Sequence, residues 1–298
     1  MPQFERERWT TPDADFIDVD FLKSTAPAQA PTLVLFHGLE GSSASHYAQS
    51  FASWALRANV HFALPHFRGC SGELNLAPRA YHSGDHEEID WVLKRVQQRQ
   101  GPKVPVLAAG VSLGGNALMR WAGEHGSRAA QTVCAVASIC SPLDLTASGQ
   151  AIGRGFNRQV YTRMFLRSMK PKALAKLQQH PGLFDPQALA RATDLYSFDN
   201  IFTAPLHGFK DTVDYWSQAS AKPVMQDIAL PALALNAKND PFIPAYSLPQ
   251  PSDVSRYVEL WQPAHGGHVG FATGPVPGDL ASLPQAVGGW LLEKVLHG

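Results

Sequence analysis

Cysteine is scarce in this sequence, and an excess of charge of either sign is missing. The 298 residues include three cysteines, a number too small and odd for a disulfide-stapled scaffold. The 25 Lys and Arg residues equal the 25 Asp and Glu residues, so the formal net charge is zero. General nucleic-acid-binding proteins carry a basic excess. We therefore expect no nucleic-acid partner.

Long apolar runs are also missing. No stretch approaches the ~20 apolar residues that a transmembrane helix needs. Residues 1–16 alternate charges and lack the apolar segment of a signal peptide. Together with the few cysteines, these absences predict a protein of the reducing cytoplasm. Hydrophobic residues still make up 45% of the chain, which is an ordinary balance for a globular protein.

The sequence is organised around the pentapeptide Gly-Val-Ser-Leu-Gly at 110–114. A short apolar run at 104–109 precedes it, and residues 116–121 have the apolar spacing of a helix. A Gly-x-Ser-x-Gly pattern between a strand and a helix is typical of a nucleophile elbow, a sharp turn that exposes the serine hydroxyl. We therefore predict that Ser112 is a catalytic nucleophile.

Short apolar runs alternate with helical patterns along most of the chain. Buried strands are predicted at 32–36, 60–64, 104–109, 132–139, 231–235 and 254–261. Helices are predicted at 47–55, 85–96, 116–121 and 287–295, the second with a capping pattern of Asp85 and Glu88. Such alternation is typical of an α/β fold with a parallel sheet between two layers of helices. Residues 15–22 add an antiparallel edge strand.

The alternation stops at Asp144 and resumes near Leu230. The residues between them are rich in aromatics and show helical patterns but no strong strand. An insertion at this point of an open α/β sheet lies over the carboxyl ends of the strands, where ligands bind. We predict an α/β core over 1–143 and 228–298, with a helical cap insertion over 144–227.

A serine nucleophile needs a base and a carboxylate that orients the base. In the elbow type of hydrolase the partners follow in the order serine, acid, histidine, each after a strand. Ser112, Asp240 and His268 have this order and placement. Asp144 and His265 are the alternative acid and base, because each also lies near the end of a predicted strand.

Acyl transfer also needs two hydrogen-bond donors for the oxyanion. One is expected to be the amide of Leu113, the residue after the nucleophile. The other is expected to be the amide of Leu39, in the glycine-rich loop after the strand at 32–36. His37, at the start of this loop, has either a structural or a functional role on the sequence alone.

The motifs resemble those of the YheT-like branch of the α/β-hydrolase superfamily, relatives of lipid-cleaving animal hydrolases and yeast ester synthases. The matching segments are HGLEGSS (37–43), FRGCSGE (67–73), YHSGDHEEIDWVL (81–93), GVSLGGN (110–116), FTAPLHGFKDTVDYW (202–216), NAKNDPF (236–242) and GGHVGF (266–271). The resemblance implies a serine hydrolase of acyl esters with Ser112, Asp240 and His268 as its triad. His66 and Asn239 depart from the expected pattern and affect the charge near the site.

The prediction is thus an esterase of short- to medium-chain or lipid-like esters that needs no metal or organic cofactor. Its alternatives are acyl transfer to an alcohol on the same triad and ligand binding without turnover.

His82 and His86 are spaced for a metal, but a capping turn is the favoured interpretation. Cys70 is interpreted as a packing residue and Arg68 as an ion-pair partner.

A basic segment lies within the predicted cap. No acidic residue occurs between Asp144 and Asp185, whereas seven cations do: Arg154, Arg158, Arg163, Arg167, Lys170, Lys172 and Lys176. Phe156, Val160 and Met164 recur among them at helical spacing. Two interpretations stay open. The segment either contacts anionic lipid peripherally, or it is a solvated face balanced by acids elsewhere in the fold.

Overall fold

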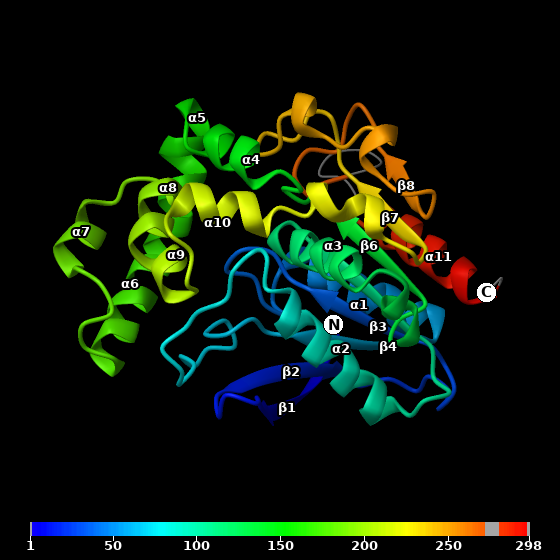
Figure 1. The fold of residues 1–298 in the computed structure, drawn as a ribbon. Helices are drawn as coiled ribbons and strands as arrows, with labels where there is room; N and C mark the ends of the chain where they lie inside the picture. The colour runs from blue at the N-terminus through cyan, green and yellow to red at the C-terminus, as the bar shows by residue number, and fades with distance from the viewer. Residues whose placement is uncertain (1, 272–279, 297–298) are drawn as a thin grey trace.

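The computed structural model describes residues 2–271 and 280–296, and its centre is an eight-stranded sheet (Figure 1). The strands are β1 (Phe4–Thr10), β2 (Phe16–Leu22), β3 (Thr32–Phe36), β4 (His61–Pro65), β5 (Val106–Val111), β6 (Ala135–Ile139), β7 (Ala232–Leu235) and β8 (Val258–Trp261). They lie in the order β1-β2-β4-β3-β5-β6-β7-β8. All pairs from β4 to β8 are parallel, so the predicted α/β class is confirmed.

Helices cover both faces of the sheet because the central strands are apolar on both faces. The flanking helices are α1 (His46–Ala58), α2 (His86–Gln100), α3 (Leu113–His125) and α11 (Ser282–Leu296). In β3, Val34 belongs to the same apolar cluster as residues of α2 and α3, whereas Leu33 and Leu35 belong to the cluster of α1 and α11. The two-residue period of a strand thus divides the core into two layers.

The sheet edge differs from the prediction. The predicted edge strand at 15–22 is β2, which lies between β1 and β4 with all seven residues buried. The true edge is β1, where Arg6 and Arg8 bind Asp20 and Asp18 across the pair, at 2.7 and 2.8 Å. His66 bonds the same Asp20 at 2.8 Å, so its departure from the family pattern serves this sheet edge.

Residues between β6 and β7 form helices and connecting loops, and no strand is described there. We call residues 144–227 the inserted segment. Its elements are α4 (Leu145–Ile152), α5 (Gly155–Asn157), η2 (Arg158–Thr162), α6 (Arg163–Gln179), α7 (Pro186–Arg191), α8 (Leu195–Phe198), η3 (Asp199–Thr203), α9 (Ala204–Leu206), α10 (Thr212–Ala219) and η4 (Lys222–Asp227). Figure 1 shows α5 to α9 on the side of the molecule away from α11.

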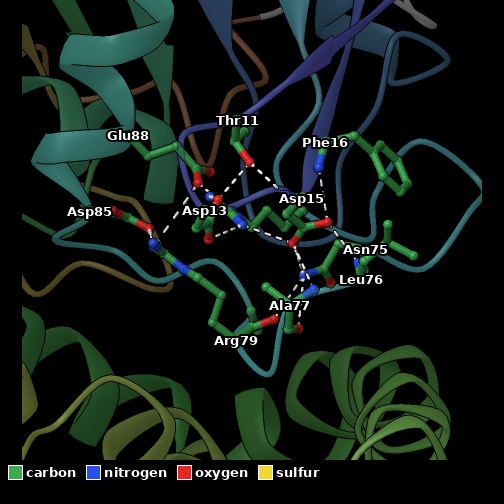
Figure 2. Close-up of polar contacts among 12 residues, drawn as sticks. Thr11, Asp13, Asp15, Phe16, Asn75, Leu76, Ala77, Arg79, Asp85 and Glu88 are labelled. Atoms are coloured by element: carbon green, nitrogen blue, oxygen red, sulfur yellow. Dashed lines mark hydrogen bonds and ion pairs between the residues drawn. The ribbon is translucent and has the colours of Figure 1, made fainter.

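Arg68 joins the β1–β2 turn to α2 in a polar network. Figure 2 labels the carboxylates of this network, which belong to Asp13, Asp15 and Glu88. Its guanidinium binds Asp13 and Asp15 at 2.8 Å each and Glu88 at 2.5 Å. Only 6% of Arg68 is exposed. The residue is therefore an ion-pair partner, as the sequence indicated.

The capping hydrogen bonds predicted for Asp85 and Glu88 at the start of α2 are not formed. Asp85 occupies the N-cap position, but its side chain makes no capping hydrogen bond. Its carboxylate binds Arg79 (Figure 2). The carboxylate of Glu88 binds Arg68. Two nearby guanidinium groups outcompete the helix amides for these carboxylates, because ionic hydrogen bonds are the stronger ones.

Asp15 in this network makes acid stability testable. Burial raises its pKa, but hydrogen bonds from Asn75 and the amides of Leu76 and Phe16 outweigh burial and lower the pKa to about 2. Because the folded pKa lies below the unfolded value of about 3.9, the stabilisation is complete above that value and is lost as the pH falls towards 2.

We expect Asp15→Asn to lower the free energy of unfolding at pH 7 by about 2 kcal/mol. Urea denaturation at pH 7 and pH 3 measures this loss, and the difference between variant and wild type should shrink at the lower pH. Asp185→Asn is the control, because Asp185 caps α7 at the surface. Equal losses in both variants would contradict the prediction.

Candidate active site

Ser112 stands at a strained turn between β5 and α3. Its backbone has φ 53° and ψ −119°, a conformation that L-residues rarely adopt and that clusters at functional sites. The two flanking glycines of the motif permit this turn. A Cβ on Gly110 would lie 2.5 Å from the Gly114 oxygen, and one on Gly114 would lie 2.5 Å from the His37 oxygen. The motif thus has the predicted context of strand, sharp turn and helix.

Asp240 and His268 are in contact, although they are 28 positions apart in the sequence. His268 Nδ1 lies 2.8 Å from Asp240 Oδ2, and the Phe242 amide donates to Asp240 Oδ1 at 2.8 Å. Asp240 follows β7 and His268 follows β8, so parallel pairing of the strands brings both to one sheet edge. A neutral imidazole that donates from Nδ1 to this carboxylate carries its lone pair on Nε2, as a general base requires.

The two alternative residues lie in other surroundings. Asp144 Oδ1 accepts a hydrogen bond from the Ala147 amide at 3.0 Å, which caps α4. His265 is exposed to solvent. Within the described residues, neither of them lines the cavity that contains Ser112 and His268.

The loop after β3 packs against Ser112. A Cβ on Gly38 would lie 3.2 Å from the Cβ of Ser112. Among the described residues, no acceptor is found for the backbone amides of Leu39 and Leu113. Both residues line the cavity next to Ser112. Two unpaired amides beside a nucleophile are what an oxyanion hole requires.

His37 holds this loop in place. Its Nδ1 donates to the Gly38 oxygen at 2.7 Å, and its Nε2 accepts from the Phe67 amide at 3.0 Å. Complete burial lowers the pKa of His37 to about 3, so the ring stays neutral and both bonds use one tautomer. Of the two roles open on the sequence, the contacts favour the structural one.

Two residues that the sequence did not single out for this purpose hold the loop of His268. Cys140, which follows β6, has its sulfur 3.7 Å from the Gly267 oxygen and 3.4 Å from the Val269 nitrogen. The Asn239 side chain accepts from the Gly267 amide at 2.9 Å. Gly267 and Val269 both have positive φ, at 60° and 63°. Such a backbone persists only where its surroundings fix it.

A cavity of about 670 Å³ lies beside Ser112 and His268. Ser112, Leu113 and His268 line it from the sheet edge. The inserted segment supplies mostly apolar walls, with Ile152, Met164, Phe165, Met169, Leu195, Phe198, Phe202 and Trp216. A largely apolar cavity with a few convergent polar groups is typical of a small-molecule site.

His82 and Cys70, which the sequence also singled out, have contacts that fit a turn and a packed position. His82 Nδ1 accepts from the Gly84 amide at 3.2 Å, and its ring packs on His207 at 4.6 Å, which fits a turn. In the described parts of the chain, no three His, Cys, Asp or Glu side chains gather as metal ligands do. Burial raises the pKa of Cys70 to about 12, in keeping with a packing role.

Known proteins resemble this chain along nearly its whole length. Residues 31–275 match the family model described as alpha/beta hydrolase fold. YheT of Escherichia coli (strain K12), a protein provisionally named an esterase, is 38% identical over 289 residues, which cover 96% of this chain and 84% of that one. Phospholipase ABHD3 of Mus musculus is 26% identical over 307 residues, which cover 99% and 73%.

A solved structure shares the fold. The esterase Pf2001 of Pyrococcus furiosus superposes with a TM-score of 0.60 and 13% sequence identity, over 99% of this chain and 93% of that chain. At this identity the likeness concerns the fold alone.

Proposed function

We propose that this chain, which belongs to the alpha/beta hydrolase fold family, cleaves carboxylic esters through an acyl-enzyme on Ser112. Its esterase-type relatives support the assignment as a hydrolase. One observation carries the proposal. His268 bonds Asp240 at 2.8 Å and lines the same cavity as Ser112, which stands on a strained elbow. Nucleophile, base and orienting acid thus come from three strand ends.

The proposed reaction has two halves. In the first, Ser112 Oγ attacks the ester carbonyl while His268 Nε2 takes its proton, and the amides of Leu39 and Leu113 hold the oxyanion. The tetrahedral intermediate collapses to the acyl-enzyme, and the alcohol leaves with the proton from His268. In the second half, water attacks the acyl carbon with His268 as base, and the acid leaves as Ser112 regains its proton.

The cavity walls favour an apolar acyl group. We treat residues 144–227 as a cap over a core of residues 1–143 and 228–298, because the inserted segment supplies the aromatic and aliphatic lining. Short- to medium-chain acyl esters and lipid-like esters fit such walls. A cytoplasmic location stays a prediction from the sequence.

A graded series of nitrophenyl esters tests the proposal. We expect saturable hydrolysis by the purified protein, with kcat/KM rising from acetate towards medium chains as more apolar surface is buried. Product analysis with an added alcohol separates hydrolysis from acyl transfer, the alternative on the same triad. No turnover of any ester, together with no labelling by a fluorophosphonate, would favour binding without turnover.

The loop contacts of Cys140 give a further prediction. Cys140→Ala should lower kcat about tenfold with KM unchanged, because two bonds beside His268 are lost and each contributes about 1 kcal/mol or less. Cys140→Ser keeps a donor and an acceptor and should recover most of the rate. Cys134→Ala is the matched control, since Cys134 is an exposed free thiol. A tenfold loss in the Cys134 variant, or no loss in Cys140→Ala, would contradict this role.

A further inference from the structure

Two lysines of the basic segment face inwards and have partners. Lys172 Nζ lies 2.9 Å from Glu40 Oε2, next to the loop after β3. Lys176 is 1% exposed, and its Nζ donates to the oxygens of Asn75 and Ala77 at 2.5 and 3.0 Å. These two cations therefore have partners within the fold, and both line the cavity.

The arginines of the same helical stretch have the opposite orientation. Arg154, Arg158, Arg163 and Arg167 are all exposed. Within residues 2–271 and 280–296, none of the four is in an ion pair; Arg158 donates to the Thr193 hydroxyl at 2.8 Å. Both interpretations of the basic segment therefore stay open: Lys172 pairs with an acid elsewhere in the fold, whereas the four arginines are exposed to solvent.

Three apolar side chains lie exposed among these arginines. Phe156 is 72% exposed, Met164 53% and Val160 43%. They recur every four residues along α5, η2 and α6, so they lie near one another on the stretch. We call these three residues with the four arginines the outer face. Exposed apolar groups that cluster in this way commonly mark an interaction surface.

The outer face continues into the active site. Met164 also lines the cavity. The ring centroids of Phe156 and Tyr161 lie 6.4 Å apart. Those of Tyr161 and Phe242 lie 4.6 Å apart, and those of Phe242 and His268 lie 4.4 Å apart. A row of aromatic rings therefore leads from the exposed surface to the proposed general base.

We propose that the outer face rests on an anionic lipid surface and places the cavity mouth against it. Apolar side chains flanked by arginines match the interfacial region of a bilayer, where chains are buried below a layer of phosphate. The contact is peripheral, since none of the described helices has the length and apolar character to span a membrane. The delivery of ester to the cavity rests on the proposed function, whereas the docking itself does not.

Flotation with vesicles tests the docking. Wild type should float with vesicles of phosphatidylcholine and phosphatidylglycerol in equal parts at low salt, and should stay at the bottom with phosphatidylcholine alone. Salt should weaken the binding by screening. The triple variant Arg158→Glu, Arg163→Glu, Arg167→Glu should lose binding at least tenfold, and Phe156→Ser should weaken it at every salt concentration.

A matched control keeps the test specific. Lys23→Glu, Arg57→Glu, Lys103→Glu changes the net charge equally at exposed positions outside the inserted segment and should float like wild type. Both triple variants should hydrolyse a small soluble ester at the wild-type rate, which separates failed docking from a failed enzyme. Wild type left at the bottom with anionic vesicles, or equal losses in the two triple variants, would overturn the proposal.

Discussion

Ser112→Ala is expected to remove ester hydrolysis, with a loss in kcat of about 10⁶-fold. The hydroxyl supplies the atom that bonds the acyl carbon, and no other group can take its place on the strained turn where φ is 53°. A fluorophosphonate probe should label the wild-type protein at Ser112 alone, because only an activated serine reacts. Steady-state kinetics measures the first expectation, and peptide mass spectrometry of the labelled protein measures the second.

The control for this experiment is Ser217→Ala, at an exposed serine of α10. That variant should keep both turnover and labelling. Because Ser112 lies at the turn between β5 and α3 and is not part of the packed core, the alanine variant should melt near the wild-type temperature. Label found on another residue, or an active alanine variant, would remove Ser112 from its proposed role.

The sheet could be predicted where a strand is apolar on both faces. β3 runs from Thr32 to Phe36, as the uninterrupted apolar run predicted. The edge strand β1 could not be predicted from the sequence, because ion pairs such as Arg6–Asp20 and Arg8–Asp18 hold it against β2. The partners of these charges lie on another strand, and their register follows from folding, not from local pattern. A stretch of charged residues has the same sequence pattern whether its side chains form ion pairs or are solvated.

The candidate site follows a similar division. Ser112, Asp240 and His268 could be selected from the sequence because each follows a strand, and parallel strands end at one edge of the sheet. The roles of Cys140 and Asn239 could not be predicted from the sequence. Both side chains bind backbone groups around His268, and no side-chain motif indicates such contacts. The cations of the inserted segment likewise look alike in sequence, and only burial separates the lysines that face inwards from the arginines that face outwards.

Asp240→Asn is expected to lower kcat by about 10⁴-fold, and the hydrogen bonds of Asp240 explain why. The Phe242 amide donates to Oδ1 at 2.8 Å, so an asparagine must place its oxygen there. Its NH₂ group then faces His268 Nδ1 and donates to it. The imidazole must carry its proton on Nε2, where it cannot accept the proton of Ser112.

Asp144→Asn is the matched comparison, because it makes the same chemical change at the alternative acid. Asp144 accepts one bond from the Ala147 amide, and an asparagine oxygen can accept that bond as well. We expect its kcat to stay within a factor of about two of wild type, since neither nucleophile nor base is touched. Steady-state kinetics on one soluble ester, with melting temperatures for both variants, decides between the acids. A large loss in Asp144→Asn with an active Asp240→Asn would transfer the role to Asp144, and the 2.8 Å contact between His268 and Asp240 argues for the opposite result.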